Sequence, residues 1–468
     1  MDLTPQWQLR ARFAKALSDL YGNEVPAYTT LVEVSQDVNR DFVAANPDTA
    51  DRFGSINRVT AERHGAIRVG SPTELAQVAR VFGAIGMQPV GFYDLRDAKP
   101  NPIPVVSTAF RPVDRAELAR NPFRVFTSLL VPEDRRFFTP ELEQQLKDFI
   151  AARTLFPQEL LEIADRSIAD GGLAAADADH FIELATASFA LSPEPVDRAW
   201  YEKLDAISSV AADIGGVNST HINHLTPRVL DIDDLYRRMS DRGIQMIDAI
   251  QGPPRWDGPD LLLRQTSFRA LAEPRAFREA DGTVGSGDLR VRFGEVEARG
   301  IALTQSGRDH YDTMVGEVDS RQAATGRPRP EVAREVWGEL CAPTERDLLE
   351  RDHGFFNFTA VKTGSSGAPA DLLALIDGGW LVAEPIVYED FLPRSAACIF
   401  ASNLSGDGSV DESQDIAARD LPWMAEQIGV AVNDPYALYA SERQASFEAA
   451  VSALGLSAPS VTTPWSGR

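Results

Sequence analysis

The stretch RHGAIRVG, residues 63–70, and the stretch HLTPRVLDI, residues 224–232, decide how this chain folds. Each is a strand-like run that opens with a histidine followed four residues later by an arginine, and each leads into a helical pattern. The first helical pattern covers residues 71–87, where Ser71, a proline and a glutamate form a typical helix start. The second covers residues 233–242, directly before a glycine. Both stretches therefore predict a strand followed by a helix.

Three further strand-like runs follow each helical pattern. In the first copy they are residues 88–95, 107–111 and 123–130; in the second copy they are residues 244–250, 265–269 and 291–300. This agreement in order indicates an internal duplication. Each copy is a β-α-β-β-β module, and we expect an α+β fold in which the duplicated modules build a mixed sheet or half-barrel core that carries large helical insertions.

The modules and the patterns around them predict the organisation of the whole chain. We expect N-terminal helices (1–55), the first module (56–132), a helical insertion (133–215), the second module (216–305), a helical region (306–380), a pocket-closing strand with C-terminal helices (381–456) and a disordered tail (457–468).

Composition excludes several classes of protein. Apolar residues make up 44% of the 468 residues, enough for a large core, and the net charge is −23. Such an acidic surface repels phosphate backbones and anionic lipid, so we expect neither a nucleic acid nor a membrane as partner. The only cysteines, Cys341 and Cys398, exclude a disulfide framework. We find no signal-like apolar core and no membrane-spanning run, and expect a cytoplasmic protein; the oligomeric state stays open.

Six histidines are present, so a metal site can be sought by elimination. His221 and His224 stand three residues apart, so on a strand they point to opposite faces and are not expected to bind one metal together. The repeat instead aligns His224 with His64, which shares a strand face with Arg68. Because Pro227 disturbs the strand, geometry alone leaves the choice between His221 and His224 open. The remaining histidines lie in helical phrases and are not expected to be ligands: His180, His310 and His353.

A carboxylate usually completes a site with two imidazoles when open coordination positions are needed. The candidates are Glu295 and Glu297, and Gly294 favours Glu295 because glycine permits a close approach. The alternative, that both are solvent-facing strand carboxylates, stays open from the residues alone. An arginine on the same strand as a metal-bound histidine can hold a substrate carboxylate through two hydrogen bonds. Arg68 suits this role, whereas Arg228 follows a proline and suits a structural salt bridge equally well.

Several longer motifs resemble one known family. They are RHGAIRVG (63–70), GMQPVGFYDL (86–95), STAFR (107–111), PFRVFTSLL (122–130), HINHLTPRVLDID (221–233), LLRQTSF (262–268), RFGEVEARG (292–300) and YEDFLP (388–393). Together they resemble the 2-oxoadipate dioxygenase/decarboxylase family over most of the chain. The fold of that family resembles the vicinal-oxygen-chelate enzymes, which include hydroxymandelate synthase, and this agrees with the duplicated modules.

The resemblance implies an Fe(II) enzyme of D-lysine and 2-aminoadipate catabolism that converts 2-oxoadipate and O2 into D-2-hydroxyglutarate and CO2. By the family pattern His64, His224 and Glu295 bind Fe(2+), and His64 and Arg68 hold the substrate. One position departs from the pattern: Arg394 stands where a small apolar residue is expected. It either clamps the distal carboxylate of the substrate or faces outward, so the accepted chain length stays open. Two other functions remain as alternatives: a metal-dependent isomerase or lyase using Zn2+, Ni2+ or Mn2+, and a 2-oxo-acid binding protein.

Overall fold

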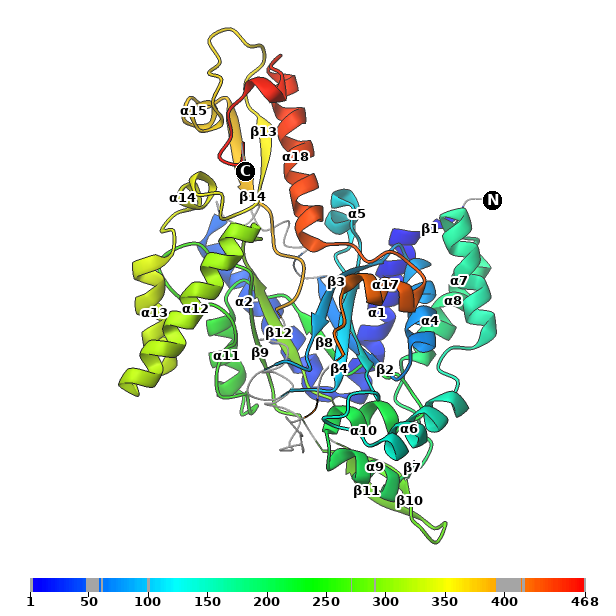
Figure 1. The fold of residues 1–468 in the computed structure, drawn as a ribbon. Coiled ribbons are helices and arrows are strands. Elements are labelled where there is room, and N and C mark those ends of the chain that lie inside the picture. The colour runs from blue at the N-terminus through cyan, green and yellow to red at the C-terminus, as the bar shows by residue number, and fades with distance from the viewer. Residues whose placement is uncertain are drawn as a thin grey trace. The chain divides into compact units, whose positions relative to one another are not determined.

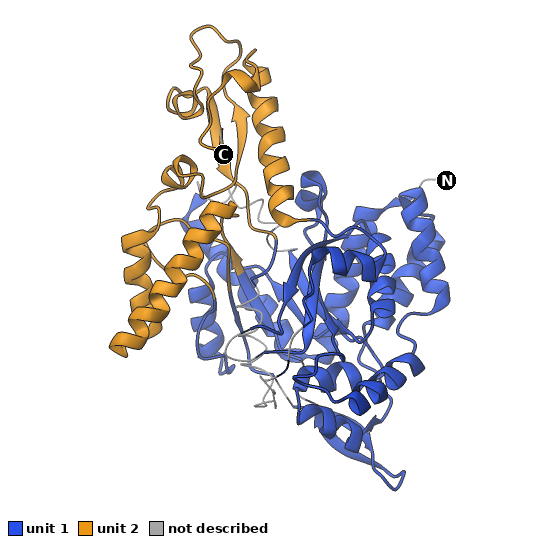
Figure 2. Cartoon of the chain, viewed as in Figure 1, with its two compact units in different colours: residues 1–251, 265–297, 390–433 blue, residues 252–264, 298–389, 434–468 orange. Residues whose placement is uncertain are grey.

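The computed structural model has an α+β fold (Figure 1). It describes residues 3–47, 59, 62–98, 102–270, 272–289, 292–392, 414 and 417–466. The chain forms two compact units (Figure 2): unit 1 contains residues 1–251, 265–297 and 390–433, and unit 2 contains residues 252–264, 298–389 and 434–468. Within the described ranges, no helix combines the length and the apolar composition that a membrane span needs.

The first module contains the elements that the sequence predicts. They are β2 (Arg63–Val69), α4 (Pro72–Gly83), β3 (Gln88–Asp94), β4 (Val105–Arg111) and β5 (Arg124–Leu130), with a short helix α5 (Arg115–Arg120) before β5. The side chain of Ser71 caps α4 by accepting a hydrogen bond from the backbone N–H of Glu74. β2, β4 and β5 are buried along their whole length, although each also contains polar or charged residues.

One five-stranded sheet joins the two modules in the order β3-β4-β5-β2-β8. β2 lies parallel to β5 and antiparallel to β8 (His224–Pro227), the first strand of the second module. An isolated parallel bridge then joins Arg228 to Glu297 on β12 (Glu295–Arg299), and β12 pairs with β9 (Leu263–Ser267). From β2 outward the first module has the order β2-β5-β4, and from β8 outward the second module has the order β8-β12-β9. In both modules the first strand is therefore followed by the fourth and then by the third.

The second module is less regular than the sequence predicts. β8 ends at Pro227, which has no N–H to donate to a ladder, so the predicted strand over 224–232 is shortened. The predicted strand over 244–250 is wrong: the segment contributes only an isolated bridge between Met246 and Phe268. Only Met246 and its neighbour Ile247 are buried there, too few to hold a full edge strand against the sheet. The helix that follows β8 is present as α11 (Ile232–Asp241).

A hairpin between β9 and β12 was not predicted. Its strands, β10 (Glu273–Arg278) and β11 (Val284–Leu289), pair antiparallel, and the turn between them places Gly282 at a positive φ of 86°. The Asp281–Gly282 dipeptide is a strong turn signal that could have revealed this hairpin. The two strands are only partly buried and have few large apolar residues, so they lack the hydrophobic pattern that marks the other strands.

The other elements of unit 1 are mostly helices. They are β1 (Thr4–Pro5), α1 (Gln6–Glu24), α2 (Pro26–Ala45), α6 (Pro140–Ala152), α7 (Gln158–Asp170), β6 (Gly172–Leu173), α8 (Ala175–Ser188), β7 (Val196–Asp197), α9 (Arg198–Asp205), α10 (Ser209–Gly215) and α17 (Leu421–Ile428). The insertion between the modules is helical, as its capped and periodic sequence predicts.

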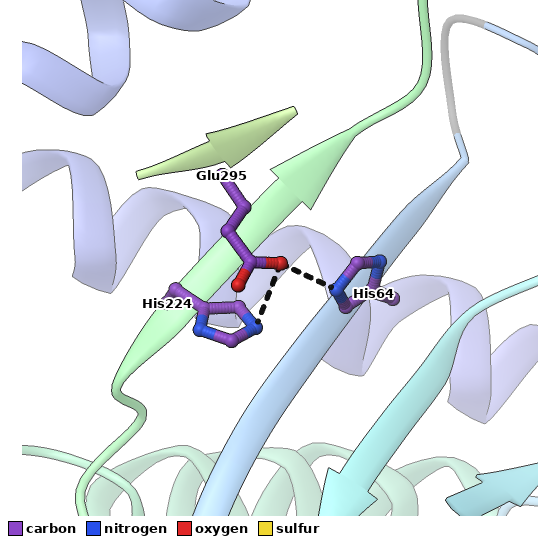
Figure 3. A group of neighbouring side chains, drawn as sticks. All are labelled: His64, His224 and Glu295. Carbon is purple, nitrogen blue, oxygen red and sulfur yellow. Dashed lines mark hydrogen bonds and ion pairs between the residues drawn. The ribbon is translucent and has the colours of Figure 1, made fainter. Parts of the chain in front are cut away.

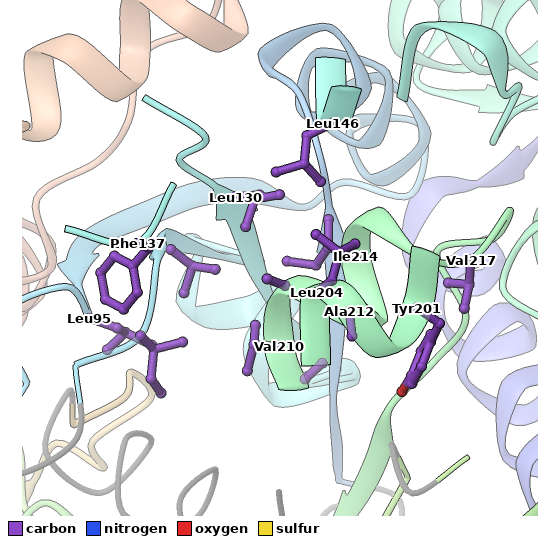
Figure 4. Packing of buried hydrophobic residues seen from close by; sticks show 14 of the residues in the cluster. Leu95, Leu130, Phe137, Leu146, Tyr201, Leu204, Val210, Ala212, Ile214 and Val217 are labelled. Atoms are coloured by element: carbon purple, nitrogen blue, oxygen red, sulfur yellow. The ribbon is translucent and has the colours of Figure 1, made fainter. Parts of the chain in front are cut away.

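The helical insertion completes the core beneath the sheet (Figure 4). Leu146 of α6, Leu204 of α9 and Ile214 of α10 are each at most 1% exposed and belong to one apolar cluster with Leu130 of β5. Gly215 ends α10 where a Cβ atom would lie 2.4 Å from the Leu146 side chain. Only glycine allows α6 and α10 to approach this closely, and the approach fixes α10.

Unit 2 contains helices and an antiparallel pair of strands. Its elements are α12 (Gln305–Thr325), α13 (Arg329–Leu340), α14 (Glu345–Glu350), β13 (Phe356–Ala360), α15 (Leu372–Asp377), β14 (Leu381–Pro385), α18 (Pro435–Ala453) and the 3-10 helix η2 (Ala458–Ser460). The predicted disordered tail is wrong for residues 457–466. The Trp465 ring packs 5.9 Å from the rings of both Phe358 and Phe447, so aromatic burial holds this segment in place.

Candidate metal centre

Three buried side chains from different strands meet in unit 1 (Figure 3). His64 comes from β2, His224 from β8 and Glu295 from β12, and one potential ligand atom from each lies within 4.8 Å of the others. The Oε2 atom of Glu295 is 3.2 Å from Nε2 of His64 and 3.5 Å from Nε2 of His224. Each of the three side chains is at most 5% exposed. These are the residues that the sequence nominated as metal ligands.

Strand register explains why residues so distant in sequence meet. In the antiparallel β2–β8 pair, His64 lies opposite Thr226 and His224 lies opposite Ala66. Both histidines therefore lie where the first strands of the two modules pair. Their rings are 5.4 Å apart. Glu295 reaches them from β12, where its Oε2 atom accepts a hydrogen bond of 3.4 Å from the Thr226 hydroxyl. The pairing of the two module-opening strands therefore creates the site.

The donor set suits a divalent transition metal. Two imidazoles and one carboxylate are the protein ligands of many sites that keep coordination positions open. The Nε2 atom of Gln265 also donates a hydrogen bond of 3.3 Å to Oε2 of Glu295, so four side chains converge on this one oxygen. Such convergence on a buried carboxylate fits a cation-binding position. Among the described residues, His64, His224 and Glu295 are the one group of three side chains that could hold a metal ion.

The structure distinguishes Glu295 from Glu297. Glu295 faces both histidines, whereas Oε2 of Glu297 lies 2.8 Å from the other ring nitrogen of His64, Nδ1. Both carboxylates are buried, so the alternative of solvent-facing strand carboxylates is wrong. The expected close approach at Gly294 is confirmed, because a Cβ atom there would lie 2.0 Å from the Phe268 ring. Phe268 thus packs directly under the backbone that presents Glu295.

The two histidines have different electrostatic surroundings. Burial lowers the pKa of His224 to about 4, so its ring is neutral at neutral pH, which is the form that binds metals. Burial also lowers the pKa of His64, but the negative charge of Glu297 and hydrogen bonds with both carboxylates outweigh it, and the pKa lies above its ordinary value. His64 therefore stands in the more negative environment of the two.

Arg68 lies beside this group on β2 and is 3% exposed. Its Nη1 atom forms an ion pair with Asp213 of α10. The same carboxylate lies 3.1 Å from Nε2 of His221 and accepts a hydrogen bond of 2.9 Å from Asn223. Burial raises the pKa of Asp213, but His221 and Arg68 outweigh it and hold the pKa below its ordinary value. His221 therefore contacts the partner of Arg68 and is not one of the three clustered residues, as strand parity predicts.

The remaining candidates behave as follows. Arg228 forms a buried salt bridge with Glu62, 2.9 Å between Nη1 and Oε2, which confirms the structural alternative for this residue. His180 pairs with a surface glutamate, and His310 stacks on His353 with ring centroids 5.0 Å apart. Arg394 lies outside the described residues, as does Cys398.

Several residues of the site were not predicted as such. The Phe391 ring lies 5.0 Å from the His64 ring and 5.1 Å from the Phe126 ring, so it forms an apolar wall next to the three clustered residues. Asp390 holds this segment in place through a buried two-point ion pair with Arg111. The YEDFLP motif contains both Asp390 and Phe391 and was the available signal, but no periodicity indicates which side chains of a loop face a site.

The chain thus has a duplicated α+β fold, and two histidines and a carboxylate form a candidate metal-binding site where the two modules meet. The sequence model of the 2-oxoadipate dioxygenase/decarboxylase family matches residues 13–403. Two relatives bear that name: one from Mycobacterium bovis, 55% identical over 92% of this chain and 95% of its own, and one from Pseudomonas putida, 40% identical over 96% and 97%. The chain therefore belongs to the 2-oxoadipate dioxygenase/decarboxylase family.

Solved structures support the same assignment. The crystal structure of the hydroxyglutarate synthase in complex with 2-oxoadipate from Pseudomonas putida matches with a TM-score of 0.82 and 36% identity, over 97% of this chain and 100% of that one. A Shigella flexneri structure containing a domain of unknown function matches with a TM-score of 0.79 and 34% identity, over 95% of this chain and 99% of that one. The α+β fold of hydroxyglutarate synthase thus extends over 97% of this chain.

Proposed function

We propose that this chain is an Fe(II)-dependent dioxygenase and decarboxylase that converts 2-oxoadipate and O2 into D-2-hydroxyglutarate and CO2. The observation that carries the proposal is the buried group of His64, His224 and Glu295, found in a chain of this family. The reaction balances without another reductant: one oxygen atom enters the new carboxylate, the other enters the hydroxyl group, and the 2-oxo acid supplies all four electrons. No separate 2-oxoglutarate is needed.

In this proposal the two histidines and Glu295 hold Fe(2+), which when bound supplies positions for the 2-oxo acid and O2 and activates both. Arg68 binds a substrate carboxylate, because it shares the face of β2 with His64 and is buried. Asp213 holds the guanidinium in position for that contact. A local arginine is required because the net charge of −23 repels a dicarboxylate.

The aromatic wall has a part in the same proposal. Phe391 packs on the His64 ring and Phe293 on the His224 ring, Phe126 supports Phe391 from behind, and together they exclude water from the reacting end of the substrate. Arg394 follows Phe391 closely in sequence and is proposed to meet the distal carboxylate of the substrate. The proposed setting is lysine breakdown through 2-aminoadipate in the cytoplasm.

Oxygen uptake with product identification tests the proposal. Purified protein with Fe(II) and ascorbate should consume O2 and 2-oxoadipate in equal amounts and release equal amounts of CO2 and 2-hydroxyglutarate. Turnover with Zn2+ or Mn2+ and no O2 uptake would support an isomerase or lyase instead. Tight binding of 2-oxoadipate without turnover under any of these metals would support a binding protein.

A further inference from the structure

A chain of buried charged side chains leads away from His64 on the side opposite Glu295. Nδ1 of His64 lies 2.8 Å from Oε2 of Glu297, and Oε1 of Glu297 lies 3.1 Å from Nη1 of Arg124. Nη2 of Arg124 lies 2.8 Å from Oε1 of Glu62, and Oε2 of Glu62 lies 2.9 Å from Nη1 of Arg228. All four charged side chains are at most 1% exposed, and their signs alternate.

Fold stability alone does not account for this chain of charges. Charges removed from water carry a desolvation penalty that can exceed their mutual attraction, and well-packed apolar residues can often replace such pairs without loss. Here four charges lie in the core and link both modules: Arg124 belongs to β5, Glu62 precedes β2, Arg228 follows β8 and Glu297 belongs to β12. The feature that sets these charges apart is their end point, the ring nitrogen of His64 that does not face Glu295.

We propose that Glu297 is a positioning residue for His64, and that Arg124, Glu62 and Arg228 hold Glu297 in place. With Oε2 of Glu297 2.8 Å from Nδ1 of His64, the carboxylate favours a proton on Nδ1, which selects that tautomer and leaves the Nε2 lone pair on the side of Glu295. A carboxylate in this position also makes the imidazole a stronger electron donor. This inference rests on the proposed metal site.

His224 has no equivalent support. Its Nδ1 atom is buried and, among the described residues, no carboxylate forms an ion pair with it, whereas Nδ1 of His64 lies 2.8 Å from Glu297. The ring is instead held by aromatic packing, with the Phe293 ring centroid 5.2 Å away and the planes inclined by 38°. The two histidines, although equivalent by duplication, are therefore unequal ligands: His64 is oriented by charge and His224 by packing.

Metal affinity tests this inequality directly. Mn(II) binding to the Glu297→Gln protein, measured by calorimetry without substrate, should be about 10- to 100-fold weaker than binding to the wild type. Glu74→Gln is the matched control, because Glu74 is a buried carboxylate that pairs with Arg153 at 2.8 Å and, within the described part of the chain, bonds to none of the three clustered residues. Unchanged Mn(II) affinity in Glu297→Gln would overturn the inference.

A measurement on the wild type covers the case in which Glu297→Gln does not fold. With six histidines, a sample labelled with nitrogen-15 at histidine gives a small set of ring signals in the Zn(II)-bound protein. His64 should be protonated at Nδ1 and coordinated through Nε2, with its N–H proton farther downfield than that of His224. Coordination of His64 through Nδ1 would overturn the inference. Failure of the wild type to bind any of these metals would instead overturn the proposed function.

Discussion

Replacing Asp213 by asparagine should weaken substrate binding while leaving the three clustered residues in place. Asp213 is 2% exposed and contacts Arg68, His221 and Asn223 at once; within the described ranges it bonds to none of the three clustered residues. Asparagine keeps the shape and one acceptor oxygen but removes the charge. The guanidinium of Arg68 is then without its buried counter-ion and without the constraint on its orientation.

The size of the effect follows from the kind of interaction that the substitution removes. A hydrogen bond to a charged group contributes about 1.5–3 kcal/mol, and about 1.4 kcal/mol corresponds to a factor of ten. If the loss of orientation appears fully in substrate binding, kcat/KM for 2-oxoadipate falls about 10- to 150-fold. Most of the change should appear in KM, because Arg68 is proposed to bind a carboxylate and not to take part in the chemistry.

Steady-state O2 uptake at saturating Fe(II), measured over a range of 2-oxoadipate concentrations, separates KM from kcat. Asp134→Asn is a suitable control, since Asp134 is also a buried aspartate that pairs with an arginine, Arg136 at 2.8 Å, and lies on a different segment from Arg68. The expectation is a large increase in KM for Asp213→Asn and none for Asp134→Asn. If Asp213→Asn folds, binds Mn(II) and keeps the wild-type KM, the role assigned to Asp213 is wrong.

Three further changes test other parts of the site. In metal-free protein, His224→Gln should become more stable relative to the wild type as pH falls from 6.5 to about 4, by up to about 3 kcal/mol in unfolding free energy. The reason is that His224 takes up a proton in this pH range when the chain is unfolded but not when it is buried. Urea unfolding at each pH measures the difference, and a difference that does not change with pH would refute the prediction. Phe391→Ala should lower coupling between O2 uptake and product formation, because the wall beside His64 opens to water, and equal stoichiometry would contradict this. Gly294→Ala should cost about 1–3 kcal/mol or more in unfolding free energy, since its Cβ would lie 2.0 Å from Phe268; an unchanged urea midpoint would show that the ring can move.

The sequence predicted the first module well because its signals are local. Capping at Ser71 and burial on both faces of β2 and β5 leave clear marks within a few residues. The second module was predicted less well because its segments depend on neighbours. Residues 244–250 are apolar enough for a strand, but few of them are buried, and the strands of the β10–β11 hairpin are only partly buried. The local hydrophobic periodicity of a segment does not show whether segments distant in sequence will bury it.

The candidate site shows the same division. Residue type and the repeat nominated His64 and His224, strand parity only disfavoured His221, and the β2–β8 register brings the nominated pair together. The sequence favoured Glu295 over Glu297 only narrowly, because both point to one face, and the structure shows that both contact His64 while Glu295 also faces His224. The pairing of Arg68 with Asp213 was equally invisible, since nothing in α10 indicates which strand it will cover.

The duplication also explains why three candidate metal ligands gather and not four. In the first module Ala66 lies opposite Phe126, and the equivalent place in the second module brings Thr226 to Glu295. A carboxylate at position 126 would have given each copy one histidine and one acid. Phenylalanine stands there instead and packs against Phe391. Three candidate protein ligands, and no fourth, would leave a bound metal with open coordination positions for a substrate and a second reactant.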